Sequence, residues 1–334
     1  MKAIALLSGG LDSTLAAKLI LDQEIELEAV NYYTPFCTCT SKDSSCMASQ
    51  KAAQQIGISL KVLHADLRYL DMIQNPKHGY GRNMNPCIDC RIFIFKKAKE
   101  YMEQTGASFI ITGEVLGQRP MSQRREAMNL IDKESGLAGL VLRPLSASLF
   151  EPSLPEREGW VDRDKLLNIS GRSRKPQIKL AQEKGINDYP CPAGGCLLTE
   201  DEFSKKMKDL FSHDHQQDNL MNEVKLLKIG RHFRASPKAK IIVCRDETEN
   251  KKIENLVRPG DMILETKDHL GPITLIRGRA DEEVIKTAAS FTARYSKAKT
   301  ADNIKVGFSR FPDDKEEIIT TTIVPEGIYS QLRI

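Results

Sequence analysis

Short apolar runs alternate with helical patterns through the first half of the chain. The strand-like runs are Ala3–Leu7, Leu27–Tyr33, Lys61–Ala65 and Ser108–Thr112, and helical spacing covers Leu15–Leu21, Ser49–Ile56 and Ile92–Thr105. Such alternation predicts βαβ units and therefore an α/β fold with a doubly wound parallel sheet. Because sites in such sheets lie beyond the carboxyl ends of the strands, the loops beginning at Ser8, Tyr32, Asp66 and Gly113 should surround one crevice.

The pattern changes after about residue 143, where prolines interrupt short helical pieces. We therefore predict a first domain over residues 1–150 and an accessory lobe over 151–211, followed by a polar linker at Ser212–Asn219. Beyond the linker, Lys225–Ile229, Lys240–Cys244, Met262–Thr266 and Ile273–Gly278 predict strands. They indicate a small basic α/β domain over 221–311, with a C-terminal tail over 312–334.

Composition narrows the class of protein. A chain of 334 residues with 40% hydrophobic content can bury more than one core. No apolar run approaches the ~20 residues of a membrane span, and no secretory segment is evident, so we expect a cytoplasmic protein without a membrane partner. In that compartment, the eight cysteines are better explained as metal-binding or catalytic thiols than as disulfides. Residues 223–311 hold 19 Lys/Arg against 12 Asp/Glu, which favours a polyanionic partner.

The first predicted strand runs into the loop Ser8-Gly9-Gly10-Leu11-Asp12-Ser13-Thr14. Paired glycines before a helix let backbone N–H groups approach phosphate, and the hydroxyls of Ser8 and Ser13 add donors. A Walker A loop would end in Gly-Lys-Ser/Thr, and that ending is absent. The loop instead resembles the PP-loop of the ATP pyrophosphatase superfamily.

That resemblance implies ATP cleavage between the α- and β-phosphates, with AMP transferred to the substrate. Asp12 would then hold Mg²⁺ or orient the triphosphate. Asn31 ends the second strand, where relatives contact adenine, and Gly113 begins another loop at the same edge of the sheet.

Two thiols at C-x-x-C spacing, Cys87 and Cys90, precede a predicted helix, and Cys196 follows the pair Gly194-Gly195. Three thiolates can hold three irons of a 4Fe-4S cluster and leave the fourth iron open, and a helix N-terminus would lower the pKa of such thiols. Together with the PP-loop, this set resembles the PP-loop tRNA thiouridine synthetases. The resemblance implies that Cys87, Cys90 and Cys196 are the catalytic or cluster-binding residues.

Three alternatives stay open for these thiols: a persulfide on one of two cysteines, Cys191 as third ligand in place of Cys196, and a structural Zn²⁺ on Cys87, Cys90, Cys191 and Cys196. A second group, Cys37, Cys39 and Cys46, has either a metal or sulfur-handling role or consists of ordinary reduced loop thiols. Cys244 lies in an apolar run and should be a core residue. His213 and His215 are expected to be solvated linker residues.

Several polar residues are candidates for contacting substrate or tRNA: Glu114, Gln118, Arg119, Arg172, Arg174, Lys175, Arg231 and Arg234. The last two flank Phe233 on a predicted turn, where the aromatic ring would be available for stacking on RNA bases. The segment from about Lys225 to Arg279 resembles the NFACT RNA-binding domain.

The resemblance implies a tRNA sulfurtransferase that adenylates a uridine carbonyl oxygen and replaces it with sulfur from sulfide or a sulfur carrier. Among the products, 4-thiouridine is preferred over 2-thiouridine. We do not expect the long form of 4-thiouridine synthetase, because a THUMP-like extension and a rhodanese domain are lacking. A homodimer stays open. The competing hypotheses are a PP-loop ligase or sulfur transferase acting on a small molecule, and an RNA-binding protein with a structural zinc site.

Overall fold

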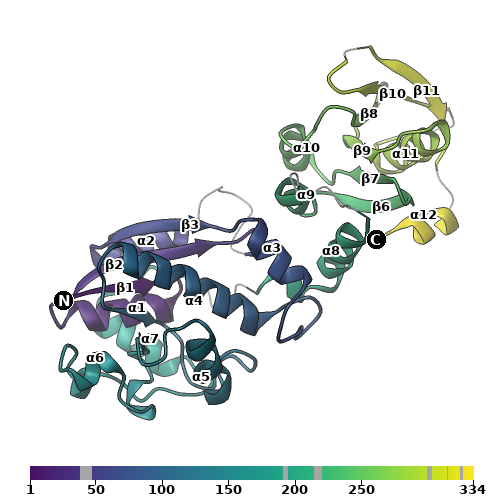
Figure 1. Cartoon of the computed structure of the whole chain (residues 1–334). Helices are drawn as coiled ribbons and strands as arrows, with labels where there is room; N and C mark the ends of the chain where they lie inside the picture. The colour runs from purple at the N-terminus through teal and green to yellow at the C-terminus, as the bar shows by residue number, and fades with distance from the viewer. Residues whose placement is uncertain (38–46, 191–194, 214–219, 299–302, 314, 324–325) are drawn as a thin grey trace. The chain divides into compact units, whose positions relative to one another are not determined.

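The computed structural model describes residues 1–37, 47–190, 195–213, 220–298, 303–313, 315–323 and 326–334. The chain divides into two compact units, Met1–Thr199 and Glu200–Ile334, each built on its own sheet (Figure 1). The finer division into four parts stays a prediction. Within the described ranges, no helix combines the length and the apolar character needed to cross a membrane.

The first unit contains a five-stranded sheet whose paired strands are all parallel. Its strands are β1 (Lys2–Leu6), β2 (Glu26–Tyr33), β3 (Ser59–His64), β4 (Phe109–Thr112) and β5 (Val141–Leu142), in the order β3-β2-β1-β4-β5. The four strands predicted from the sequence are confirmed. The fifth, β5, has only two residues and therefore no periodicity by which a sequence could reveal it.

Helices cover both faces of this sheet, as the doubly wound prediction requires (Figure 1). They are α1 (Leu11–Leu21), α2 (Met47–Ile56), α3 (Leu67–Gln74), α4 (Cys87–Gln104), α5 (Arg125–Glu134), α6 (Leu154–Arg157) and α7 (Lys175–Glu183), with short 3-10 turns η1 (Ala147–Leu149), η2 (Arg163–Lys165) and η3 (Leu197–Thr199). Alternate strand residues face opposite sides. Ala3 and Phe109 pack in the core beneath α1, whereas Ile4 and Ile110 pack with Phe95 of α4.

The strand order reverses at β1, which pairs with β2 on one side and with β4 on the other. Chain connections leave in opposite directions at this point, so the carboxyl ends of β1 and β4 open a crevice between their loops. The PP-loop follows β1, and Gly113 follows β4. The fold therefore brings the two loops together at one edge of the sheet.

The second unit contains a six-stranded sheet with antiparallel pairing and the order β11-β10-β8-β9-β7-β6. Its strands are β6 (Arg231–Ser236), β7 (Ala239–Val243), β8 (Met262–Thr266), β9 (Thr274–Gly278), β10 (Ile304–Arg310) and β11 (Glu317–Thr321), and its helices are α8 (Asp201–His213), α9 (Leu220–Leu226), α10 (Glu247–Glu254), α11 (Glu282–Tyr295) and α12 (Glu326–Leu332). Ile241 faces the core beneath α11, whereas Ile242 packs with residues of α9 and α10.

Two local predictions in this unit were wrong. The run Lys225–Ile229 was expected to be a strand, but α9 covers Leu220–Leu226 and the chain turns after it, so that Leu226 and Ile229 both pack in one apolar cluster. The expected turn around Phe233 is strand β6. Its Phe233 ring is fully buried against Phe291, with ring centroids 4.3 Å apart, so it is not available to stack on RNA.

Candidate active site

The PP-loop has a geometry that only glycine permits at its first position. Gly9 has φ +80°, and a Cβ atom there would lie 2.3 Å from the carbonyl carbon of Ala48 at the start of α2. The Ser8 and Ser13 hydroxyl oxygens are 3.1 Å apart, and Ser13 donates a hydrogen bond to the Gly10 carbonyl. The loop is therefore compact, and α1 begins directly after it at Leu11.

Asp12 lies at the centre of a polar network at the start of α1. One carboxylate oxygen, Oδ2, accepts a 2.8 Å hydrogen bond from Gln118 and lies 3.4 Å from the Arg174 guanidinium. Gln118 in turn accepts from Gln177 of α7. The other oxygen, Oδ1, is buried and has no hydrogen-bond partner among the described residues. A buried carboxylate oxygen without a partner is suited to a cation or to a ligand donor.

A cavity of about 80 Å³ opens beside this network. Asp12, Arg91, Gly113, Gln118 and Arg119 are among the residues that line it, together with Ser8, Gly10 and Ser13 of the loop. Gly113 makes the close approach of the two loops possible, because a Cβ atom there would lie 2.4 Å from the Ser13 backbone nitrogen. Of the four loops predicted to surround one crevice, those beginning at Ser8 and Gly113 line this cavity, and those beginning at Tyr32 and Asp66 do not.

Asn31 lies near the end of β2, as predicted, but its side chain is buried and its amide nitrogen is already hydrogen-bonded. Its amide nitrogen donates a 2.8 Å hydrogen bond to the Leu7 carbonyl, which ties β2 to the end of β1. Its carbonyl oxygen has no hydrogen-bond partner in the described part of the chain. As an adenine contact, Asn31 stays a prediction.

The segments that carry the three predicted cysteines are in contact, although Cys196 is far from the others in sequence. Cys87 begins α4, and its thiol donates to the Asn85 side chain at 3.2 Å. Two hydrogen bonds tie the loop before Cys87 to the segment after Cys196: Asn83 to the Thr199 carbonyl at 2.8 Å, and the Met84 amide to the Leu198 carbonyl at 3.1 Å.

Tyr69 is a buried residue beside the Cys90 thiol. Its hydroxyl is 3.1 Å from the Cys90 sulfur, and its ring packs against Phe93 and Tyr32. Burial, first, and then the neighbouring Cys90 and Cys196 raise the pKa of Tyr69 well above its ordinary value. Nothing in the sequence around Tyr69 marks it as part of the site.

The expected acidity of the thiols was wrong for this structure. Burial raises the pKa of both Cys87 and Cys90, and this effect exceeds the opposing influences on each thiol. For Cys87 these are the nearby guanidinium groups of Arg119 and Arg91 and the hydrogen bond to Asn85, and for Cys90 the leading one is the hydrogen bond to Tyr69. These two thiols are therefore less acidic than an ordinary cysteine in this structure.

Arg91 and Arg119 connect the cavity with the cysteines. Both line the cavity, and both lie close enough to Cys87 to oppose the rise of its pKa. Arg119 is exposed, yet partial loss of solvation around its guanidinium and then the nearby Arg91 lower its pKa. Sequence reasoning missed Arg91, although its position one helical turn after Cys87 places both on one face of α4.

The sequence predicted that Glu114 faces the crevice, but in the structure its side chain is buried and paired. It is 1% exposed and pairs with Arg91 at 3.3 Å and with Arg143 at 3.2 Å, and Arg143 also binds Asp132 at 2.7 and 2.8 Å. A buried carboxylate needs such partners. Glu114 therefore holds Arg91 in place beneath the cavity.

The basic residues predicted to contact tRNA differ in whether another side chain of the protein already contacts them. Arg172 and Lys175 are exposed, and they flank Arg174, whose partner is Asp12. In the second unit, Arg231 lies over the Tyr295 ring at 4.1 Å, and Arg234 forms a two-pronged pair with Asp209 at 2.6 and 2.9 Å. As tRNA contacts, all of these stay predictions.

The predictions made for the other cysteines are confirmed in one case and wrong in another. Cys244 is 1% exposed, which confirms the core assignment. Cys37 forms an isolated antiparallel backbone bridge with Cys196. The Cys37 sulfur is in a disulfide bond, but not with Cys196, so a reduced loop thiol was the wrong interpretation for it. Cys39, Cys46, Cys191 and His215 lie outside the described residues. Within the described part, no group of three or more His, Cys, Asp and Glu side chains is placed to hold one metal ion.

Comparison with known proteins identifies relatives of both units. Residues 1–148 match the family model for the thiamine biosynthesis protein ThiI, and residues 230–331 match the model for the NFACT protein RNA-binding domain. The tRNA-specific 2-thiouridylase MnmA of Leptospira interrogans (serovar copenhageni) is 28% identical over 212 residues, covering 56% of this chain and 54% of that protein.

The MnmA of Pseudomonas fluorescens strain SBW25 is 31% identical over 219 residues, covering 62% of this chain and 54% of its own length. A solved 4-thiouridine synthetase in complex with RNA and ATP is 21% identical, with a TM-score of 0.39 and coverage of 67% of this chain and 53% of that one. The chain thus spans about half the length of the curated relatives it matches. The resemblances read from the sequence are confirmed: residues 1–148 resemble the ThiI family, and residues 230–331 resemble the NFACT RNA-binding domain.

Proposed function

We propose that this chain is an ATP-dependent tRNA sulfurtransferase that adenylates a uridine carbonyl oxygen and replaces it with sulfur. The observation that carries the proposal is that two arginines lie beside both the PP-loop cavity and the Cys87 thiol. Arg91 and Arg119 line the cavity beside the PP-loop and also act on Cys87. The same two guanidinium groups are thus near the expected positions of ATP and of the sulfur-carrying thiol. This suits a reaction in which a uridine oxygen is adenylated and sulfur then attacks the carbon that bears it.

In the first step, the uridine oxygen attacks the α-phosphate, and pyrophosphate leaves. The loop of Ser8, Gly10 and Ser13 would bind phosphate oxygens through hydroxyl and backbone N–H donors. Arg119 would stabilise charge on the transferring phosphate, because a guanidinium beside developing negative charge lowers the energy of the transition state. The unpaired Asn31 carbonyl oxygen would accept from the adenine amino group.

Mg²⁺ fits the donor set, because the buried Oδ1 of Asp12 lacks a hydrogen-bond partner among the described residues and is a hard oxygen ligand. For sulfur, we propose a 4Fe-4S cluster on Cys87, Cys90 and Cys196. The C-x-x-C pair and the hydrogen bond between the segments that carry Cys87 and Cys196 support that donor set, although the described side chains are not arranged around one metal ion in this structure. When bound, such a cluster would supply sulfide to the activated carbon.

The RNA half of the proposal rests on residues in both units. Arg172 and Lys175 are exposed near the cavity, where they can contact tRNA phosphates. The likeness of residues 230–331 to an RNA-binding domain supports a second contact. The sulfur donor, a homodimer and a cytoplasmic location stay predictions. So does the ring position: the sequence favours 4-thiouridine, while the curated relatives are named as 2-thiouridylases.

The test is an anaerobic incubation of the full chain with ATP, Mg²⁺, sulfide and unmodified tRNA, followed by nucleoside analysis. We expect thiouridine and an iron-dependent brown colour, both lost in Cys87→Ala. Cys244→Ala, which removes a thiol from the other unit, should retain both. Pyrophosphate release without any thiouridine would instead favour a small-molecule substrate and would refute the proposal.

A further inference from the structure

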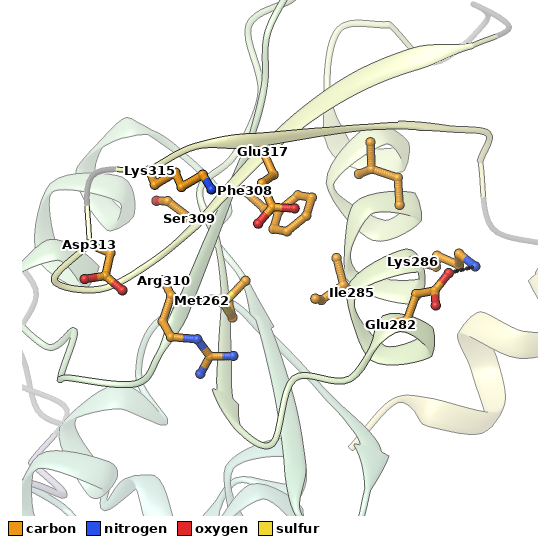
Figure 2. Close-up of a pocket in the computed structure, with 11 residues that line it drawn as sticks. Met262, Glu282, Ile285, Lys286, Phe308, Ser309, Arg310, Asp313, Lys315 and Glu317 are labelled. Atoms are coloured by element: carbon orange, nitrogen blue, oxygen red, sulfur yellow. Dashed lines mark hydrogen bonds and ion pairs between the residues drawn. The ribbon is translucent and has the colours of Figure 1, made fainter.

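A larger cavity, of about 460 Å³, lies in the second unit, between α11 and strands β8, β10 and β11. Met262, Ile285, Phe308 and Ile319 line it with apolar surface, and Figure 2 shows the first three directed into the same space. The volume lies within the range of pockets that hold small ligands or single groups of larger ones. No residue of the proposed active site contributes to it.

Charged side chains stand around this apolar lining in equal numbers: Lys286, Arg310 and Lys315 against Glu282, Asp313 and Glu317. Lys286 is already paired with Glu282 at 2.5 Å, and Arg310 donates one hydrogen bond to the Gly260 carbonyl. Lys315 and Glu317 have no side-chain hydrogen bond or ion pair among the residues the structure describes. Two opposite charges are therefore available to a ligand at the same opening.

Because the charges around the lining balance, they give a phosphate alone no net attraction. This composition suits a nucleobase with its flanking phosphates. Bases of single-stranded RNA stack on aromatic rings and are read by hydrogen bonds on their exposed edges. The partly buried Phe308 ring offers a stacking surface, and Arg310 and Lys315 offer cations for the backbone.

The carboxylate selects among bases. Glu317 projects beside Phe308 in Figure 2, and its two oxygens can accept two parallel N–H bonds. Guanine presents two adjacent donors on its Watson–Crick edge, whereas adenine presents one donor beside an acceptor. We propose that this pocket binds one unpaired guanine of an RNA, stacked on Phe308 and hydrogen-bonded to Glu317. The inference rests on the proposed RNA-binding function of residues 230–331.

The test uses the full chain and four fluorescein-labelled RNA heptamers, with G, inosine, A or U at the centre of a U tract, in anisotropy titrations at one salt concentration. The G heptamer should bind about tenfold tighter than the A and U heptamers. Inosine lacks the exocyclic amine and keeps one of the two donors, so it should fall between them.

Two variants locate the binding. Phe308→Leu retains apolar packing while removing the ring, and Glu317→Gln changes an exposed side chain that the fold does not need. Phe308→Leu should weaken binding of the G heptamer about tenfold, and Glu317→Gln should abolish the preference for G over A. Glu283→Gln, on the exposed side of α11 and outside the cavity, is the matched control and should behave as the wild type.

The outcomes separate this inference from the function on which it rests. Equal affinity for all four heptamers, unchanged by Phe308→Leu and Glu317→Gln, would overturn the guanine pocket even if tRNA is still bound and thiolated. It would leave the open edge of β11 as a place for a protein segment. If the wild-type chain binds neither tRNA nor any of the four heptamers, both proposals are overturned.

Discussion

Gly113 tests whether the two loops of the candidate active site depend on direct backbone contact. A Cβ atom at this position would lie 2.4 Å from the Ser13 nitrogen and 2.5 Å from the Asp12 carbonyl carbon. These are backbone atoms at the start of α1, so they cannot move aside as a flexible side chain could. Gly113→Ala should therefore push the loop after β4 away from the PP-loop.

Overpacking of this kind costs about 1–3 kcal/mol. For a unit of this size, that corresponds to a fall in melting temperature of about 2–12 °C. Gly10→Ala is a matched control in the same loop, because its Cβ atom would find only the Ser8 hydroxyl oxygen, at 3.5 Å, and its backbone φ of −81° suits any residue. Gly10→Ala should leave the melting temperature unchanged.

Thermal unfolding with and without ATP and Mg²⁺ measures both effects. A ligand present at a hundredfold excess over its Kd stabilises the folded state by about 2.7 kcal/mol. The wild type should show the resulting rise in melting temperature, and Gly113→Ala should not. A Gly113→Ala variant that melts with the wild type and retains the ATP-dependent rise would refute the close approach of the loops.

Three further predictions follow from single contacts. Arg119→Gln should slow tRNA-dependent pyrophosphate release about a hundredfold, because it removes the cation beside the phosphate, while Arg124→Gln should not; equal rates for both would argue against this role. Tyr69→Phe removes the hydrogen bond that opposes the raised pKa of Cys90, so the midpoint of Cys90 alkylation should move to higher pH, and an unchanged midpoint would refute the contact. Burial lowers the pKa of Lys206 from 10.5 to about 8. Between pH 8 and 10.5 the Lys206 amine is therefore protonated in the unfolded chain and neutral in the folded one. The free energy of unfolding should accordingly rise by about 3 kcal/mol over that range. In urea titrations Lys206→Met should lack that rise, and a rise of the same size in the variant would contradict the assignment.

The sequence revealed the parts of the fold that are marked locally. Buried parallel strands read as continuous apolar runs, which is why β1 and β4 were found, and the glycine pair at Gly9 marks a backbone conformation that other residues rarely adopt. The C-x-x-C pair marked the start of α4 in the same way. These signals placed the nucleotide loop and two of the three thiols.

Residues defined by tertiary contact could not be found in this way. Tyr69 belongs to the site because α3 packs beside Cys90, and the place of Cys196 depends on hydrogen bonds from Asn83 and Met84 to the segment after it. In the second unit, β11 is an edge strand with mostly exposed residues, so its sequence has no buried face to reveal it. Arg234 looked available for RNA but is paired with Asp209.

The central claim is that the uridine oxygen itself receives AMP, and isotope transfer tests it most directly. Unmodified tRNA labelled with ¹⁸O at the uridine carbonyls should be incubated with the full chain, ATP, Mg²⁺ and sulfide, and the AMP analysed by mass spectrometry. Since the adenylated oxygen leaves with AMP when sulfur replaces it, we predict one ¹⁸O atom in AMP for each thiouridine formed. Unlabelled AMP alongside thiouridine would show that ATP activates the sulfur donor or another group, and would contradict the account.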